Sequence, residues 1–301
     1  MIESFLRQDA FLIHRNSFLI FALLLILASP LLAGLPFTAQ IVLLGLFVLI
    51  LGMPHGALDP LLAERYGMDM DTGLKKIGFY LFYLALAGLA LLLWVFFPVI
   101  SLVAFLVISI IHFAGDWNDD LAFWLRGIAA MSLITNPCFF FPAEVNSIFT
   151  FLTFGEDTKF IVFFFQSLQI PVFILLFTGL GLHCFKAPQN FLVFLEVGAL
   201  HALASVFSPL VYFILYFCGL HSIRHYIETI SDLHKAGFKT SRIVFMIEII
   251  SVTTALIAAA IYFLSGDYQV EEGILRLVFI GLFVLTVPHM FLMGLIKNKN
   301  R

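Results

Sequence analysis

Charged residues are scarce in this chain of 301 residues: Asp, Glu, Lys and Arg make up 12% of it, against about 25% in soluble globular domains. The hydrophobic fraction is 62%, and the mean hydropathy is +1.06. A soluble domain of this composition would lack the polar side chains needed to cover its surface. The formal net charge of −3 also excludes the basic face typical of nucleic-acid-binding proteins, so no nucleic-acid partner is expected.

Cysteine is rare as well, with only Cys138, Cys184 and Cys218, and no CxxC pair occurs. Three scattered cysteines give neither an even disulfide framework nor a thiolate cluster for a structural zinc or iron–sulfur site. The HExxH motif of zinc proteases is absent, and so are solenoid repeats and low-complexity tracts.

Long apolar stretches, in contrast, are abundant. About 20 apolar residues cross the hydrocarbon core of a bilayer as a helix. The chain has such stretches at residues 17–35, 38–56, 77–97, 99–115, 121–141, 160–182, 190–207, 209–227, 243–264 and 274–296. Some neighbours are separated only by a proline turn, at Pro98 and Pro209, so we expect eight to ten spans. The predicted fold is an all-α, polytopic transmembrane bundle, and no loop is long enough to fold alone. We therefore expect a single integral-membrane domain that covers residues 1–301.

The basic residues predict the orientation of this bundle. If the N-terminus is cytoplasmic and ten spans alternate, 14 of the 16 Lys and Arg residues fall on the cytoplasmic side. Only Lys159 and Arg276 fall on the other side, as the positive-inside rule requires. We therefore expect a multi-pass protein of the cell (inner) membrane with both termini in the cytoplasm.

Five of the nine histidines lie in four short motifs close to the ends of predicted spans. The motifs are PHGALD at 54–59, HFAGD at 112–116, HSIRH at 221–225 and VPHM at 287–290. They end the second, fourth, eighth and tenth stretches, which all run in the same direction through the membrane. The five imidazoles should therefore lie at a similar depth near the cytoplasmic side. Ionisable groups within spans usually face the bundle interior and mark function.

Imidazoles that converge in this way point to metal ligation. His221 and His225 are spaced i, i+4, so both can reach one ion from a shared helix face. His55 and His112 can supply two more ligands from neighbouring helices. Each is followed four residues later by an aspartate, Asp59 and Asp116, and carboxylates commonly accept a hydrogen bond from the second nitrogen of a metal-bound imidazole.

Other polar residues near these motifs have less defined roles. His289 is a metal ligand, a support for the ligands or a substrate contact. Arg224, between two expected ligands, either pairs with Asp59 or Asp116 or is a positive-inside anchor. His201 lies inside a predicted span five residues after Glu196, which suggests a satisfied interior pair. The remaining histidines, at positions 14, 183 and 234, fall in the predicted tail or loops, where no role in chemistry is expected.

Neutral imidazole ligands suit iron, zinc, copper or nickel. Four histidines around zinc would complete its usual coordination, whereas four on octahedral Fe(II) would leave two positions open. An open site in an apolar bundle favours the hypothesis of iron and oxygen chemistry on a lipophilic substrate.

The four motifs resemble the Brp/Blh family of membrane β-carotene 15,15′-dioxygenases across roughly residues 52–294. The resemblance rests on Pro54–Asp59, His112 and Phe113 with Asp116, His221–His225, and Pro288 with His289; Ala114 stands where glycine is expected. It implies an enzyme that splits the central double bond of β-carotene with O₂ into two molecules of all-trans-retinal. It also implies Fe(2+) bound by His55, His112, His221 and His225. Members of this family commonly supply retinal to microbial rhodopsins, so a rhodopsin is an expected client.

A histidine-lined transporter for a metal or a lipid is the main alternative. It would require a path to both faces of the membrane, which the one-sided placement of the histidines disfavours. A di-iron desaturase would need several HxxxH and HxxHH clusters, and the chain has a single HxxxH. A retinal-binding photoreceptor would need a lysine deep in a span, and every lysine lies in a loop, in a tail or at a span edge.

Overall fold

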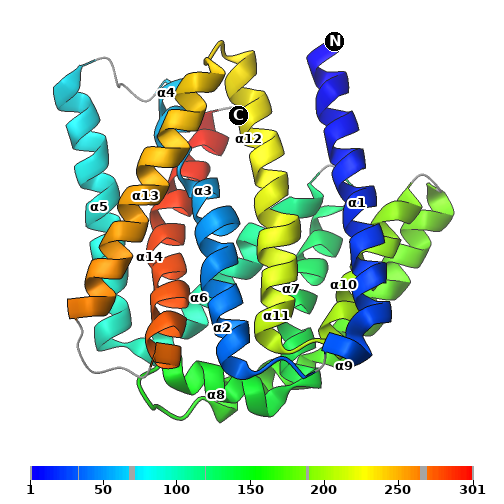
Figure 1. Ribbon diagram of the computed structural model, residues 1–301. Helices are drawn as coiled ribbons and strands as arrows, with labels where there is room; N and C mark the ends of the chain where they lie inside the picture. Colours follow the sequence, from blue (N-terminus) through cyan, green and yellow to red (C-terminus); the bar gives the residue numbers. More distant parts are fainter. Residues whose placement is uncertain are drawn as a thin grey trace.

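The computed structural model describes the backbone of residues 2–32, 34–67, 72–118, 120–187, 190–264 and 270–299. The side chains of residues 2–8, 54–55, 264 and 298–299 lie outside its described part. Throughout the described ranges the regular structure is helical, without strands, as expected (Figure 1). In chain order the elements are α1 (Ile2–Leu32), α2 (Phe37–Phe47), η1 (Val48–Gly52), α3 (Met53–Gly56), α4 (Asp59–Arg65), α5 (Gly73–Phe96), α6 (Pro98–Phe113), η2 (Ala114–Trp117), α7 (Phe123–Phe140), α8 (Pro142–Leu152), α9 (Lys159–Lys186), α10 (Phe191–Val206), α11 (Pro209–Phe213), η4 (Ile214–Ser222), α12 (Ile223–Lys235), α13 (Thr240–Leu264) and α14 (Val270–Lys299).

Prolines determine where several helices begin. Pro98, Pro142 and Pro209 each occupy the first turn of a helix, where the missing N–H has no intrahelical partner to lose. The expected breaks at Pro98 and Pro209 are confirmed. The chain also bends by 108° between α7 and α8, so a segment expected to be an outer loop contains an eleven-residue helix instead.

Within the described part of the chain, six helices are long and apolar enough to cross a membrane, and a seventh span results if the bent pair of α7 and α8 counts as one. Two further expected spans correspond to shorter apolar helices, at Phe37–Gly52 and Phe191–Val206. The expected span at 209–227 consists of α11, η4 and the start of α12. The chain is therefore a helical membrane protein, while the count of eight to ten spans stays a prediction.

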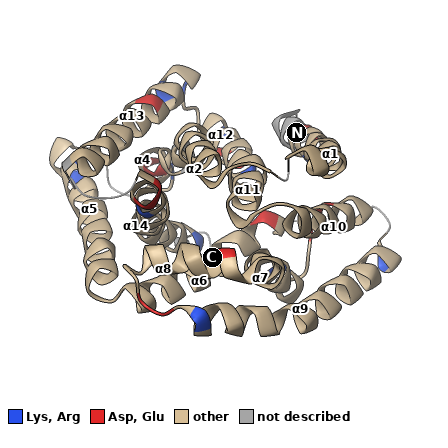
Figure 2. Ribbon diagram, turned by 60° about the horizontal axis from the view of Figure 1, so that its bottom comes forward, with Lys and Arg blue, Asp and Glu red and all other residues tan. Residues whose placement is uncertain are grey.

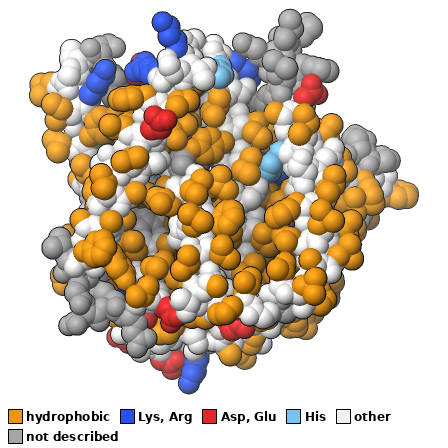
Figure 3. All heavy atoms as spheres, in the orientation of Figure 1, with side chains coloured by type: hydrophobic (Ala, Val, Ile, Leu, Met, Phe, Trp, Pro, Cys, Tyr) orange, Lys and Arg blue, Asp and Glu red, His pale blue; other side chains and the backbone are white. Residues whose placement is uncertain are grey.

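The helices divide into an outer set and an inner set. Only 6% of the apolar window of α13 is buried, compared with 39% of that of α14. Large apolar side chains such as Leu81, Phe163 and Ile257 are more than half exposed, and such side chains cover the middle of the molecule (Figure 3). Charged residues are sparse along the helices, which are mostly tan in Figure 2. This distribution is the one expected of a bundle whose outer face contacts lipid.

The first helix, α1, begins at the same end of the bundle as that at which the last helix, α14, ends (Figure 1). In the space-filling view most basic side chains also gather at this end, and few lie at the opposite one (Figure 3). The asymmetry matches the predicted charge bias of the loops. Which face of the membrane this end occupies remains a prediction.

Candidate active site: a histidine cluster

Four of the five motif histidines come together from three regions that are distant in sequence. His112 lies in the last turn of α6, His221 in η4, His225 in the first turn of α12, and His289 in the middle of α14. The ring centres of His112 and His221 are 4.7 Å apart, and those of His112 and His289 are 5.2 Å apart. His289 in turn contacts His225, with 5.3 Å between ring centres. We refer to these four residues as the histidine cluster.

The fifth motif histidine, His55, lies in the short helix α3, and its side chain is outside the described residues. Its backbone follows η1, a π-helical turn, and His221 lies in a second one, η4. Turns of this kind inside helices are frequent at functional sites. The two turns pack closely, because a Cβ atom on Gly52 would come within 2.8 Å of the Phe217 ring. That ring stacks on His221, so Gly52 permits the approach that positions this histidine.

An aspartate and a tyrosine hold His221 in place. Nδ1 of His221 donates to Oδ1 of Asp116 at 2.8 Å, and the hydroxyl of Tyr216 donates to Oδ2 of the same carboxylate at 2.6 Å. His221 is 2% exposed, so these hydrogen bonds lie in the protein interior. Asp116 was expected to orient His112 on its own helix; the partner observed is His221 from another element. The helix tightens to a 3₁₀ turn, η2, between His112 and Asp116, so the two residues are not one regular α-helical turn apart.

A second group of the same composition holds His289. Its Nδ1 donates to Asp59, with 2.8 Å to Oδ1 and 3.0 Å to Oδ2, and the hydroxyl of Tyr83 donates to Oδ2 at 2.9 Å. Asp59 and His289 are 1% and 3% exposed. Asp59 begins a new helix, α4, and pairs with His289 of α14; its expected pairing with His55 stays a prediction, because the His55 side chain lies outside the described residues. In each group the carboxylate accepts from Nδ1 and so sets the tautomer and the orientation of the ring.

Arg224 pairs with neither of these aspartates. It forms an ion pair with Glu196 of α10, and its Nη1 donates to the backbone carbonyl of Asp116 at 3.3 Å. Glu196 also accepts from the Trp117 indole at 2.9 Å and from Nε of Arg15 at 3.2 Å. Arg224 is 2% exposed and Glu196 is fully buried, so the alternative of a positive-inside anchor is also wrong. The network ties α1, α10 and α12 to the segment that carries Asp116.

The remaining histidines differ from their predicted environments. The ring of His201 packs against three phenylalanines, Phe140, Phe173 and Phe177. Its expected partner, Glu196, forms an ion pair with Arg224 instead. His14 lies within α1 rather than in a tail, and its Nε2 donates to the carbonyl of Gly219 at 3.0 Å. The other two, at positions 183 and 234, lie in the last turns of α9 and α12.

Sequence reasoning did not identify Tyr83, Tyr216 or the role of Glu196. A tyrosine in an apolar helix gives little signal, because its ring is as apolar as its neighbours. Glu196 did give a signal in the sequence, because a carboxylate within an apolar stretch of 16 residues needs a cationic partner. Sequence spacing suggested a neighbour on the same helix, whereas the partners come from α1 and α12.

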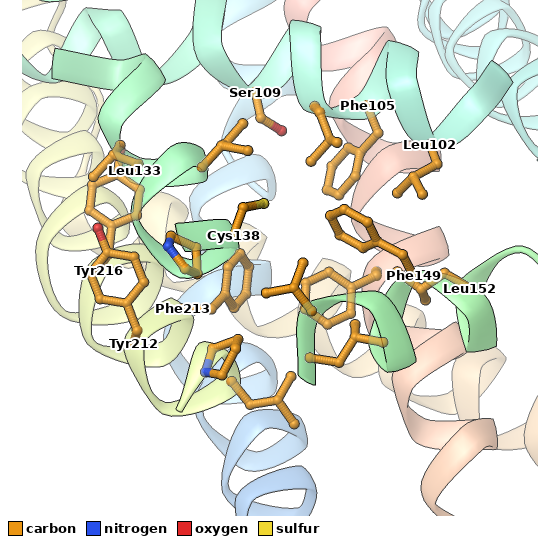
Figure 4. A pocket seen from close by; sticks show the side chains of 18 of the residues that line it. Leu102, Phe105, Ser109, Leu133, Cys138, Phe149, Leu152, Tyr212, Phe213 and Tyr216 are labelled. Carbon is orange, nitrogen blue, oxygen red and sulfur yellow. The ribbon is translucent and has the colours of Figure 1, made fainter. Parts of the chain in front are cut away.

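Three cavities border this region. The first, the α6–α8 cavity, has a volume of about 120 Å³ and includes Ser109, Phe113, Cys138 and Tyr216 in its wall (Figure 4). The second, the α5–α13 cavity, has about 300 Å³ and reaches Asp59, Tyr83 and His289. The third, the terminal-side cavity, has about 720 Å³ and lies between α1, α6, α12 and α14. Its wall includes His112, His221 and His225, together with polar residues such as Arg126 and Lys297.

The donor set suits a transition-metal ion that accepts neutral imidazole, because two rings are held through Nδ1 by carboxylates. Among the side chains that the structure describes, no three His, Cys, Asp or Glu residues are arranged as a complete metal site. The expected ligand His55 is outside that set. The assignment of His55, His112, His221 and His225 as ligands thus stays a prediction, and His289 joins them as a member of the cluster.

A model of the β-carotene 15,15′-dioxygenase family matches residues 46–297, a range that includes all five motif histidines and both aspartates. The chain belongs to this family. A family member from an uncultured marine bacterium (66A03), named β-carotene 15,15′-dioxygenase, is 34% identical over 263 residues, covering 83% of this chain and 91% of that protein. No solved structure matches the chain. The family resemblance inferred from the histidine motifs is confirmed.

Proposed function

We propose that this chain cleaves the central 15,15′ double bond of β-carotene with O₂ and releases two molecules of all-trans-retinal. The observation that carries the proposal is the histidine cluster, in which the buried His221 and His289 are each held by an aspartate. The family and the bacterial relative bear the name of this activity. A substrate made only of carbon and hydrogen can enter an apolar bundle from the bilayer without losing hydrogen bonds to water.

We further propose Fe(2+) as the metal, with His55, His112, His221 and His225 as its ligands. Bound there, the ion would supply the redox chemistry needed to activate O₂. The sequence has no cluster of thiolates, and four imidazoles would leave open positions on an octahedral ion; both points support iron over zinc. The cluster also contains His289, whose Nδ1 is fixed by Asp59 as that of His221 is fixed by Asp116.

The chain's own residues would then fix geometry rather than donate or accept protons. Asp116 and Asp59 set the tautomer and the orientation of two rings, and Tyr216 and Tyr83 in turn fix the two carboxylates. Such preorganisation keeps the ligands in place without rearrangement during turnover.

The cavities indicate how the substrate would lie. The α5–α13 cavity reaches the cluster at His289, and the terminal-side cavity reaches it at His112, His221 and His225. His112 and His289 are in ring contact, and each lines one of the two cavities. A long polyene that passes the histidines between these cavities, with its ends extending beyond them, would place its midpoint at the cluster. The central double bond would then be the one cleaved, because it would lie beside the histidines.

We also propose that the protein resides in the cell (inner) membrane with both termini in the cytoplasm, and that its retinal is supplied to a rhodopsin. The gathering of basic side chains at the end where α1 begins and α14 ends supports this orientation (Figure 3).

The direct test is expression in cells that accumulate β-carotene, with pigment loss and retinal measured by chromatography. We expect retinal from the unaltered chain and none from His225→Ala. The matched control is His234→Ala, which removes a histidine of the same helix outside the cluster. Persistence of β-carotene with well-folded, iron-loaded protein would refute the proposed substrate. A histidine-lined transporter of a metal or a lipid would then be the alternative to examine.

A further inference from the structure

The α6–α8 cavity is separate from the two cavities that touch the histidines directly. It lies between α6, α7, α8, α11 and α14, and nearly all of its wall is carbon (Figure 4). Its few polar side chains include Ser109 and Cys138, which point into the same space from α6 and α7. A ligand of this cavity must therefore be apolar.

The size of this cavity excludes half of the proposed substrate. Its volume of about 120 Å³ is smaller than the apolar cavity of about 150 Å³ that holds one benzene molecule in an engineered protein. Half of β-carotene has twenty carbon atoms, more than three times as many as benzene. Apolar cavities of this size do take up small apolar gases such as xenon.

The position of the cavity relates it to the proposed reaction. Phe113 and Tyr216 form its wall on the side of the histidine cluster. The Phe113 ring lies 4.9 Å from the His221 ring and 5.8 Å from the His112 ring, between ring centres. Tyr216 holds Asp116, the partner of His221. The Phe113 ring therefore lies between the cavity and the histidine cluster.

We propose that the α6–α8 cavity is a binding site for dioxygen that supplies the histidine cluster past Phe113. This inference rests on the proposed function, which requires O₂ as a substrate. Dioxygen is small, apolar and soluble in the bilayer, so it can reach a cavity within the bundle through fluctuations of apolar side chains. The polyene would approach the cluster through the larger cavities that reach the histidines directly, so the two substrates would not compete for space.

The first test uses xenon as a probe of the unaltered protein. Crystals of the iron-loaded protein are pressurised with xenon, and anomalous scattering locates the gas. We expect a xenon atom between Ser109 and Cys138, and its loss in Ser109→Leu, which fills the space. An absent xenon atom would overturn the proposal. Since xenon binding needs no turnover, this result is independent of whether β-carotene is the substrate.

The second test measures KM for each substrate in variants that fill the cavity. Ser109→Leu and Cys138→Leu should raise KM for O₂ by about threefold or more, with KM for β-carotene and kcat at saturating O₂ unchanged. Ser205→Leu and Cys184→Leu are matched controls outside the cavity, at an exposed and a half-buried position, and should change neither constant.

The combined outcomes separate the two proposals. An unchanged KM for O₂ in both filled variants, with cleavage intact, would overturn the dioxygen site even if xenon binds there. If the unaltered protein forms no retinal, the proposed function fails, and the xenon experiment alone decides whether the cavity takes up an apolar gas.

Discussion

His289 and Asp59, separated by 230 positions in the chain, form a buried hydrogen bond of 2.8 Å between Nδ1 and Oδ1. The bond joins α14 to the start of α4, and the hydroxyl of Tyr83 adds α5 to the same group. Asp116, His221 and Tyr216 repeat the arrangement on the other side of His112. Two Tyr–Asp–His groups from different helices thus support one histidine cluster.

Loss of either carboxylate should release the metal. Asp116→Asn and Asp59→Asn should each weaken metal retention by about 10–100-fold, because an amide does not fix the imidazole as a carboxylate does. Iron content of purified protein measures the effect. Asp232→Asn is the control, because Asp232 pairs with the partly exposed Arg65 of α4. Full iron content in both cluster variants would show that these aspartates only stabilise the fold.

The two tyrosines should also contribute to activity, because they hold the aspartates in place. Tyr216→Phe and Tyr83→Phe each remove one hydrogen bond to a buried carboxylate and retain the ring. A hydrogen bond to a charged group contributes about 1.5–3 kcal/mol, so we expect each activity to fall by about tenfold or more. Initial rates of retinal formation give the result. Tyr262→Phe, on α13, is a control outside both groups, and equal rates in all three variants would contradict the role of the hydroxyls.

The buried network around Arg224 should determine stability. Glu196→Gln leaves Arg224 and Arg15 without their carboxylate, and removal of one partner from a buried ion pair costs about 3–5 kcal/mol. Glu64→Gln provides the comparison, because the Arg242–Glu64 pair is largely exposed and should contribute less than about 1 kcal/mol. Thermal unfolding midpoints in detergent should separate the two variants clearly. Similar midpoints would show that the network carries little of the stability.

The sequence predicts which residues form this site better than it predicts which of them hydrogen-bond to one another. Spacing of the apolar stretches is sufficient to predict that the motifs at His112, His221 and His289 converge, because helices that alternate across a bilayer bring their equivalent ends to one level. The pairing of each aspartate is not predictable in this way. An i, i+4 relationship assumes an unbroken α-helix, and the helix changes at Asp59 and before Asp116.

Similar reasons explain the other differences. Glu196 could be recognised as a buried carboxylate, but its partners Arg15 and Arg224 are 181 and 28 residues away, and their contact depends on how helices pack. The α7–α8 bend lies at Phe141 and Pro142, and a proline after an apolar stretch is compatible with either a loop or a new helix. Local sequence decides where such a helix ends, whereas tertiary packing decides the direction of the chain beyond that end.

The topology gives a further prediction. A reporter fused after Arg301 should be cytoplasmic, and a reporter inserted at Glu156, in the turn between α8 and α9, should be on the opposite side. The reason is the positive-inside bias of the basic residues. A cytoplasmic signal from both positions would contradict the predicted crossing of the chain, and with it the shared depth of the motif histidines.

The central claim is that the histidine cluster binds iron for carotene cleavage. The most direct measurement is the iron content of purified protein together with its formation of retinal from β-carotene, compared with the same two quantities for His221→Ala. We predict about one iron per chain in the unaltered protein, consistent with a single site, and neither iron nor retinal in the variant. A variant that retains both, or an active protein purified without iron, would contradict the account.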